Sequence, residues 1–264
     1  MIYFLKLGGS LITDKDNPHT ARMETIHRLA EEIREAQIAL PNVRLIIGHG
    51  SGSFGHIPAK RHGTRQGVRT QAEWEGFVEV WKQARDLNQI VLDAFDQAGI
   101  PAIAFPPSAI IQSAGGKPAI VQAEPIKSAL LAGLTPVVAG DVIFDTISGG
   151  TIFSTEDVFM ALAGEIVPDR ILLCGKDEGV CQDYPDCQQI LPKIAPATYH
   201  QVHGTVNGSS SVDVTGGMRE KVEIMLNLVE KYPASQVVIF SGLAPGNLYE
   251  VLMGNIHGTV ISKD

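Results

Sequence analysis

The sequence has few cysteines, few aromatic residues and no long apolar run. Of its 264 residues, 3 are Cys and 6% are aromatic. No apolar stretch approaches the roughly 18 residues that a membrane-spanning helix needs, and residues 1–11 lack the basic leader and the cleavage site of a signal peptide. We therefore expect a cytoplasmic protein that does not bind membranes.

An odd number of cysteines excludes a framework in which every cysteine is paired. Cys174, Cys181 and Cys187 also lack the Cys-x-x-Cys spacing that is common in zinc sites. We expect ordinary thiols, and a metal site that includes His200 or His203 is the less favoured alternative.

Charged residues are only 19% of the chain, and 29 acids against 21 Lys and Arg give a net charge of −8. That balance argues against a broad surface for nucleic acid, although a few lysines could still bind a small anionic ligand. The hydrophobic fraction of 44% excludes a disordered chain. Glycine is abundant instead, and its 27 copies gather in short groups between apolar runs.

Apolar runs alternate with helical periodicity over nearly the whole chain. The runs predict strands at residues 2–7, 43–47, 100–105, 135–139, 170–174, 237–240 and 259–262. The periodic segments predict helices at residues 20–37, 70–97, 155–165, 215–232 and 248–253, and residues 141–154 are typical of a hairpin. This alternation indicates a mainly parallel sheet covered on both faces, in one α/β domain whose two lobes meet near residues 175–180.

The glycine-rich segment 48–56 reads GHGSGSFGH and contains a literal G-x-G-x-x-G from Gly50 to Gly55. A dinucleotide site would need a helix directly after this motif and an acid about 20 residues on. Because we expect residues 56–69 to be irregular and the acid is missing, that interpretation is the least favoured. A tight connection between strand and helix remains open. So does a loop whose backbone N–H groups bind phosphate, with His56 at its rim.

Two further glycine groups adjoin a lysine. Lys6 precedes the glycines of segment 8–10 at the end of the first predicted strand, and Lys221 follows those of segment 216–217. Each lysine alone is typical of a solvated side chain, but parallel strands bring their carboxyl ends to one edge, where ligands bind. Three such loops favour an anion site. The sequence lacks G-x-x-x-x-G-K-[ST], H-R-D and D-F-G, which excludes P-loop NTPases and protein kinases.

Five motifs resemble those of the amino acid kinase superfamily: KLGGSLITDK at 6–15, GHGSGSFGH at 48–56, GD at 140–141, STEDVFMALA at 154–163 and DVTGGMREKV at 213–222. The segments that end at His56 and Lys15 resemble, within it, isopentenyl phosphate kinases. The resemblance implies an open αβα three-layer sandwich with a mainly parallel central sheet, usually as a homodimer. It implies transfer of the γ-phosphoryl group of ATP, with Mg²⁺, to isopentenyl phosphate. The two lobes would then be an acceptor-binding lobe over residues 1–174 and a nucleotide-binding lobe over 175–264.

The resemblance also implies a set of site residues, and none of them is expected to be a metal ligand. The catalytic residues would be Lys6, Lys15, His56, Asp157 and Lys221. The nucleotide would contact Lys6, Gly8, Gly9, Ser10, Gly52, Asp177, Gly179, Gly217 and Lys221. The acceptor would contact Gly50, Ser51, Gly55, His56, Gly140 and Asp141.

The roles that the resemblance implies agree with the chemistry of a phosphate acceptor. Lys6 and Lys221 would contact the transferring phosphates, Lys15 would stabilise the transition state, and His56 would bind the acceptor phosphate. Asp157 would orient the lysines. A phosphate acceptor needs no general base, because its second pKa lies near 6 and its oxygen is already ionised. The chain departs from the family pattern at Ser51, where a glycine is common, and at Glu156, where an aspartate often precedes Asp157.

Other functions remain open at this stage. A same-fold kinase for a small phosphonate, of the fosfomycin type, would carry the same Ser-Phe-Gly-His loop. A kinase that phosphorylates carboxylates gives His56 no role, and the lysines argue against a non-catalytic nucleotide-binding protein. Trp74, Phe77, Val78 and Trp81 share one face of a predicted helix. We expect that face to be core, with the alternative that part of it lines a pocket for a short prenyl chain.

Overall fold

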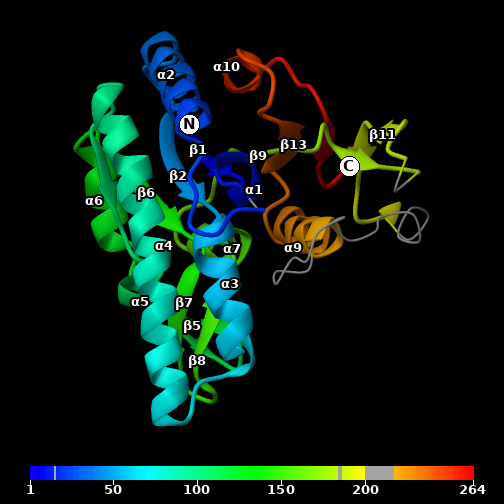
Figure 1. The fold of residues 1–264 in the computed structure, drawn as a ribbon. Helices are drawn as coiled ribbons and strands as arrows, with labels where there is room; N and C mark the ends of the chain where they lie inside the picture. Colours follow the sequence, from blue (N-terminus) through cyan, green and yellow to red (C-terminus); the bar gives the residue numbers. More distant parts are fainter. Residues whose placement is uncertain (15, 184–185, 200–216) are drawn as a thin grey trace.

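The computed structural model describes residues 1–14, 16–183, 186–199 and 217–264, and an eight-stranded sheet forms its centre (Figure 1). The neighbouring strands pair in parallel, except β13 with β14. In sheet order they are β12 (Lys193–Ile194), β14 (Thr259–Ile261), β13 (Gln236–Ser241), β9 (Arg170–Gly175), β1 (Ile2–Leu7), β2 (Arg44–His49), β6 (Thr135–Ala139) and β3 (Ala102–Ala104).

Helices cover both faces of this sheet. Successive side chains of each buried strand point to opposite faces, so the apolar side chains of both faces need a covering layer. On β1, Leu5 packs in the cluster that includes helices α2 (Met23–Ala39), α4 (Gln71–Gln97) and α10 (Asn247–Met253). Phe4, its neighbour, packs in the cluster that includes α6 (Glu124–Leu131), α7 (Thr155–Ala163) and α9 (Gly217–Lys231). The predicted αβα three-layer sandwich with a mainly parallel sheet is therefore confirmed.

A four-stranded sheet lies beside the central one, in the order β5 (Lys117–Val121), β4 (Ile111–Ala114), β7 (Asp141–Asp145) and β8 (Gly149–Phe153). Strands β7 and β8 pair antiparallel, which confirms the predicted hairpin. The sequence analysis did not predict β4, β5, α6 or the short helix α5 (Pro107–Ile110). The short segments are helix α1 (Gly9–Ile12), the 3₁₀ helix η1 (Thr64–Gln66), and the paired strands β10 (Val180–Cys181) and β11 (Ile190–Leu191).

Helix α3 (Gly52–His62) contradicts the expectation that residues 56–69 are irregular. The helix begins inside the glycine motif and contains Pro58, which is buried. Proline normally disfavours a helix interior, because it cannot donate the backbone hydrogen bond to the residue four earlier. Packing supplies the compensation, since Phe54 and Ala59 are also buried and α3 lies along α4. Tertiary burial thus overrides a local signal that argued against a helix.

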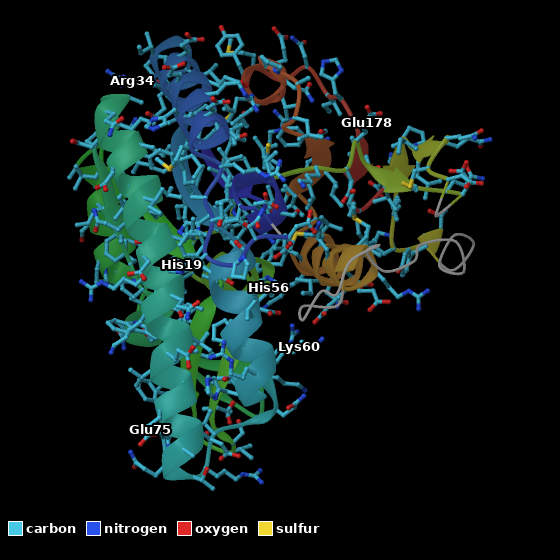
Figure 2. All side chains as sticks on the ribbon, in the orientation of Figure 1. His19, Arg34, His56, Lys60, Glu75 and Glu178 are labelled. Atoms are coloured by element: carbon cyan, nitrogen blue, oxygen red, sulfur yellow. A yellow bond between two sulfur atoms is a disulfide. The ribbon has the colours of Figure 1, made fainter. Side chains whose placement is uncertain are left out.

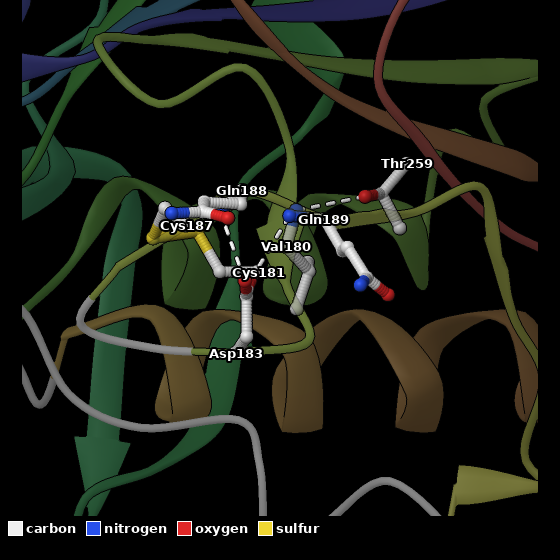
Figure 3. The surroundings of a disulfide bond; sticks show 7 residues. All are labelled: Val180, Cys181, Asp183, Cys187, Gln188, Gln189 and Thr259. Atoms are coloured by element: carbon white, nitrogen blue, oxygen red, sulfur yellow. Dashed lines mark hydrogen bonds between the residues drawn. A yellow bond between two sulfur atoms is a disulfide. The ribbon is translucent and has the colours of Figure 1, made fainter.

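The cysteines are not all thiols, which corrects a second expectation. Cys181, on β10, and Cys187, in the loop before β11, form a disulfide (Figure 3), and Cys174 is a buried free thiol. An odd total excludes complete pairing, but it does not exclude one local pair that a hairpin brings together. His200 and His203, the histidines of the alternative metal site, lie outside the described residues.

Strand β9, which ends at Gly175, lies between β1 and β13. The central sheet therefore continues across the predicted boundary near residues 175–180. The division into lobes at residues 1–174 and 175–264 stays a prediction. Among the described helices, none is both long and apolar enough to span a bilayer.

Asp145 holds the four-stranded sheet together through its carboxylate, which is buried at the end of β7. It accepts hydrogen bonds from the backbone N–H groups of Gly115, Gly116, Ile147 and Ser148 and from the Ser113 hydroxyl, at 2.6–3.2 Å. Burial alone would raise the pKa of Asp145, but these donors outweigh it and hold the pKa well below the ordinary value. One carboxylate thus satisfies both the β4–β5 turn and the β7–β8 turn.

We expect Asp145→Asn to lower the free energy of unfolding by about 2–4 kcal/mol, because an amide cannot accept at every one of these donors. Urea unfolding followed by circular dichroism measures it. The folded-state pKa is depressed, so the carboxylate stabilises the fold above its unfolded pKa of about 4 and loses this effect below that pH. The difference between wild type and variant should shrink there. Asp93→Asn, at an exposed residue of α4, is the control, and an equally small effect of both variants would contradict the assignment.

Candidate functional site

A cavity of about 460 Å³ opens where β1, β2, β6 and β9 end. It is lined by the loops that follow these strands and by the first residues of α3 and α9, whose N-termini favour negative charge. Most of the predicted site residues meet here, namely Lys6, Gly8, Gly9, Ser10, Gly50, Ser51, Gly52, His56, Gly140, Asp177, Gly217 and Lys221. The cavity therefore combines lysines with open backbone amides, and it is suited to a polyphosphate.

The first two glycine loops touch each other backbone to backbone. A Cβ on Gly9 would lie 2.6 Å from the Gly52 nitrogen, and one on Gly50 would lie 2.8 Å from the Gly9 nitrogen. Neither contact leaves room for a side chain. Ser51 is outside this contact and lies against Gly55, which explains why a serine is accommodated at a position where the resembling family often has glycine.

The side chain of Thr13 connects these two loops by hydrogen bonds. Its side chain is buried, its hydroxyl donates to the Gly9 carbonyl at 2.7 Å, and the same oxygen accepts from the Ser53 N–H at 3.0 Å. Each polar group is satisfied, so the bridge carries no buried unpaired donor. The loop after β1 and the start of α3 are thereby held at a fixed distance.

His49 supports the same loop from inside the protein. Burial lowers its pKa to about 4, and nearby Lys6 lowers it as well, although the Gly50 carbonyl opposes both. The ring is therefore neutral at pH 7. Its Nε2 lies 2.8 Å from the side-chain amide nitrogen of Asn88 and accepts from it, so Nδ1 carries the proton and donates to the Gly50 carbonyl at 3.2 Å. This bond fixes the peptide group that begins the loop.

Lys6 and Glu156 form an ion pair in the wall of the cavity. Only 13% of the Lys6 side chain and 5% of the Glu156 side chain are exposed. Burial would raise the pKa of Glu156, but the charges of Lys6 and Lys221 outweigh it and lower that pKa. Glu156 is thus an ionised carboxylate that faces both lysines.

Asp157 does not have the position that the sequence predicted for it. Its carboxylate accepts from the backbone N–H and the hydroxyl of Ser154, at 2.8 and 2.7 Å, and the Ser154 oxygen accepts from the Asp157 N–H. This is a capping box that begins α7. The prediction that Asp157 orients Lys6 is wrong, because that acid is Glu156. The spacing Ser154-x-x-Asp157 is itself a capping signal, and reading it would have separated the two acids.

A smaller cavity adjoins the first one at His56. Both cavities share Ser51, His56, Gly140 and Ile152, and the smaller one also contacts Gly55, Ala59, Arg65, Val80, Ala84 and Asp141. Burial raises the pKa of Asp141 to about 7, although the Val142 N–H, which donates to it, opposes this. Figure 2 shows His56 and Lys60 on α3, and Lys60 lines the larger cavity.

The aromatic face of α4 belongs to a small core, as the favoured interpretation predicted. Phe77 is buried against Val68 and Val142, with Trp74 and Trp81 packed beside it, whereas Val78 is exposed. The described lining of the cavities includes none of these aromatic side chains. It includes Val80 and Ala84, which lie on the adjacent face of the same helix.

Some residues differ from the predicted set. Gly179 is outside both described cavities, and a Cβ there would meet Ile190 and Thr259. Lys15 lies outside the described residues. The sequence analysis missed Lys60, Arg65 and Lys176, for which no glycine motif gave a signal. In the described part of the chain, no group of three or more His, Cys, Asp or Glu side chains gathers as a metal site.

Comparison with known proteins identifies relatives over the full length. The model of the amino acid kinase family matches residues 1–241. An isopentenyl phosphate kinase of Methanocaldococcus jannaschii is 32% identical over an alignment of 267 positions, which covers 99% of this chain and 98% of that protein. One of Methanothermobacter thermautotrophicus is 31% identical over 98% of both chains.

A solved structure of an isopentenyl phosphate kinase superimposes with a TM-score of 0.84 and 28% identity, over 99% of this chain and 100% of that one. The family model matches most of the chain, and the relatives share nearly all of its length. The chain therefore belongs to the amino acid kinase family.

Proposed function

We propose that this chain transfers the γ-phosphoryl group of ATP to isopentenyl phosphate, giving isopentenyl diphosphate and ADP. The observation that carries the proposal is the position of His56, between a cavity lined by lysines and a smaller one with apolar side chains. An acceptor with a phosphate at one end and a short hydrocarbon at the other would place its phosphate beside His56 and its hydrocarbon toward the smaller cavity, whose volume of about 20 Å³ has to widen to accept the chain. Relatives that are 31–33% identical over nearly the whole chain carry the name isopentenyl phosphate kinase.

In this proposal the larger cavity binds the nucleotide phosphates. Lys6 and Lys221 contact the transferring group, and the backbone N–H groups of the glycine loops surround it. Mg²⁺ bound to the triphosphate would reduce the charge on the phosphates, and the protein would need to supply few of its ligands. Lys15 keeps the role that the resemblance implies. We also propose that the enzyme is a cytoplasmic homodimer with acceptor and nucleotide lobes divided as in the sequence prediction.

The acceptor phosphate lies at the border of the two cavities. His56 donates to it from α3, beside the backbone of Gly50 and Ser51, and the hydrocarbon extends toward Val80 and Ala84. Apolar burial of a short chain contributes about 0.8 kcal/mol for each CH₂. This accounts for a preference for a prenyl group over a bare phosphate.

The chain's part in the reaction is positioning and charge stabilisation. An ionised oxygen of the acceptor phosphate attacks the γ-phosphorus, a new P–O bond forms, and the bond to the ADP oxygen breaks. No proton has to be removed from the acceptor first. Glu156 holds the Lys6 ammonium at the cavity wall, so that Lys6 is already in position when the negative charge shifts.

A same-fold kinase for a small phosphonate is the second candidate. Arg65 and the buried Asp141 also line the smaller cavity, and such groups would suit an acceptor that is more polar than a prenyl chain.

An ADP-release assay with a panel of acceptors separates these functions. We expect turnover of isopentenyl phosphate, less of dimethylallyl phosphate, and none of fosfomycin or acetylglutamate. Turnover of fosfomycin alone would sink the prenyl assignment and favour the phosphonate. If no acceptor is turned over while ATP still binds, a nucleotide-binding protein is the better description.

We expect substitutions of the two adjacent acids of α7 to have different effects. We expect Glu156→Gln to lower kcat about 100-fold, because Lys6 loses the carboxylate that positions it. Asp157→Asn is the matched control and should lower kcat no more than about threefold, with a fall of a few degrees in Tm through the helix cap. Steady-state kinetics and thermal unfolding measure both, and the reverse order of the two kcat values would refute the assignment.

His56 should act on the acceptor rather than on ATP. We expect His56→Gln to raise the KM for isopentenyl phosphate at least about tenfold, since a charge-assisted hydrogen bond to phosphate is lost, while the KM for ATP changes less than about threefold. His62→Gln provides the control on the same helix, because His62 pairs with Glu79 at 2.7 Å and is not among the described lining residues. Equal increases in both KM values for His56→Gln would contradict this role.

A further inference from the structure

Arg65 and Glu220 form an ion pair that joins two distant parts of the chain, 155 residues apart in sequence. Arg65 Nη2 lies 2.5 Å from Glu220 Oε1. Arg65 belongs to η1, which follows α3, and Glu220 belongs to the first turn of α9 (Figure 1). Because α3 and α9 both line the larger cavity, the pair connects its two sides.

The Arg65 end of the pair is anchored. Its backbone carbonyl accepts from the Thr151 hydroxyl of β8 at 3.1 Å, and the neighbouring Thr64 is buried. Arg65 also lines the smaller cavity, beside His56 and Asp141. The guanidinium therefore extends from a fixed point on the acceptor side.

The Glu220 end lies among other acids. Burial raises the pKa of Glu220, the Arg65 guanidinium lowers it, and the carboxylates of Asp157 and Glu156 raise it again. Without Arg65, the first turn of α9 would present a carboxylate to two others, and like charges at this range repel. Arg65 is thus the opposite charge that holds Glu220 beside α7.

The next residue after Glu220 is Lys221, which lines the larger cavity and whose charge lowers the pKa of Glu156. Successive residues of one helical turn move together. Whatever fixes Glu220 therefore also fixes the backbone from which Lys221 extends.

We propose that Arg65 and Glu220 are positioning residues that hold the first turn of α9 so that Lys221 meets the transferring phosphate. The proposal rests on the proposed function for its kinetic consequence. Arg65 contacts the acceptor cavity and Glu220 adjoins a phosphate-binding lysine, so the pair also aligns the acceptor side with the nucleotide side.

A double-mutant cycle tests the pair. We expect Glu220→Gln and Arg65→Gln each to lower kcat about tenfold, which is the effect of losing a partly buried ion pair. The kcat of the double variant should lie within about twofold of that of either single variant, because both substitutions break the same interaction. For Glu220→Gln the acceptor KM should stay within about twofold of wild type, because Glu220 is not among the described lining residues of the acceptor cavity. Arg61→Gln, which removes the more exposed pair with Glu79, is the control and should leave kcat unchanged.

Hydrogen exchange of residues 217–225 gives a readout that needs no turnover. Exchange should be faster in all three pair variants and unchanged in Arg61→Gln. Unchanged exchange in the pair variants, or losses in kcat that multiply to about 100-fold in the double variant, would overturn the proposal. If the wild-type protein turns over no acceptor, the proposed function fails, and the exchange result alone then decides whether the pair constrains α9.

Discussion

The buried ion pair between Lys6 and Glu156 is the interaction on which the arrangement of the site depends. Lys6 lies near the end of β1, a central strand, and Glu156 lies in the first turn of α7. Separating two nearly buried charges would leave each unpaired in a low dielectric, at a cost of several kcal/mol. The pair therefore fixes α7 against the end of β1. The Thr155 hydroxyl adds a second tie, since it donates to the His49 carbonyl at 2.8 Å.

The Lys6–Glu156 pair and the hydrogen bond from Thr155 hold β1, β2 and α7 in place, and this lets the glycine loops lie against each other. Gly9 and Gly50 touch through their backbones, the Thr13 hydroxyl bridges Gly9 and Ser53, and neutral His49 holds the Gly50 carbonyl. The two glycines leave their backbone groups open because they have no side chain. A chain with a net charge of −8 can thus form a local anion site, because four lysines (Lys6, Lys60, Lys176 and Lys221) and open backbone amides line the cavity.

The sequence predicted the layers of the fold because the periodicity of apolar residues agrees with their burial over long segments. Alternate residues of β1 pack in separate cores, as a doubly covered strand requires. It failed where local signals were weak or opposed by packing. Residues 56–69 were expected to be irregular, but tertiary burial stabilises α3 there, and the short elements between residues 105 and 134 are too brief to show a period.

For the candidate site, too, the sequence predicted one part and missed another. Glycine motifs adjacent to Lys6, His56 and Lys221 located the larger cavity, because strand ends in a parallel sheet converge. The assignment of the orienting acid failed, since neighbouring residues on a helix point in different directions and only Glu156 faces Lys6. Arg65 was missed because it reaches the site through a tertiary contact that no local motif records.

In the proposed reaction the cavity brings a phosphate acceptor to the γ-phosphoryl group of ATP. Phosphorus NMR of a reaction that contains the protein, ATP, Mg²⁺ and isopentenyl phosphate tests it most directly. We expect the acceptor's single phosphate resonance to be replaced by two coupled resonances of a diphosphate, in equal amount to the ADP formed. ADP that accumulates with inorganic phosphate, while the acceptor resonance is unchanged, would contradict the account.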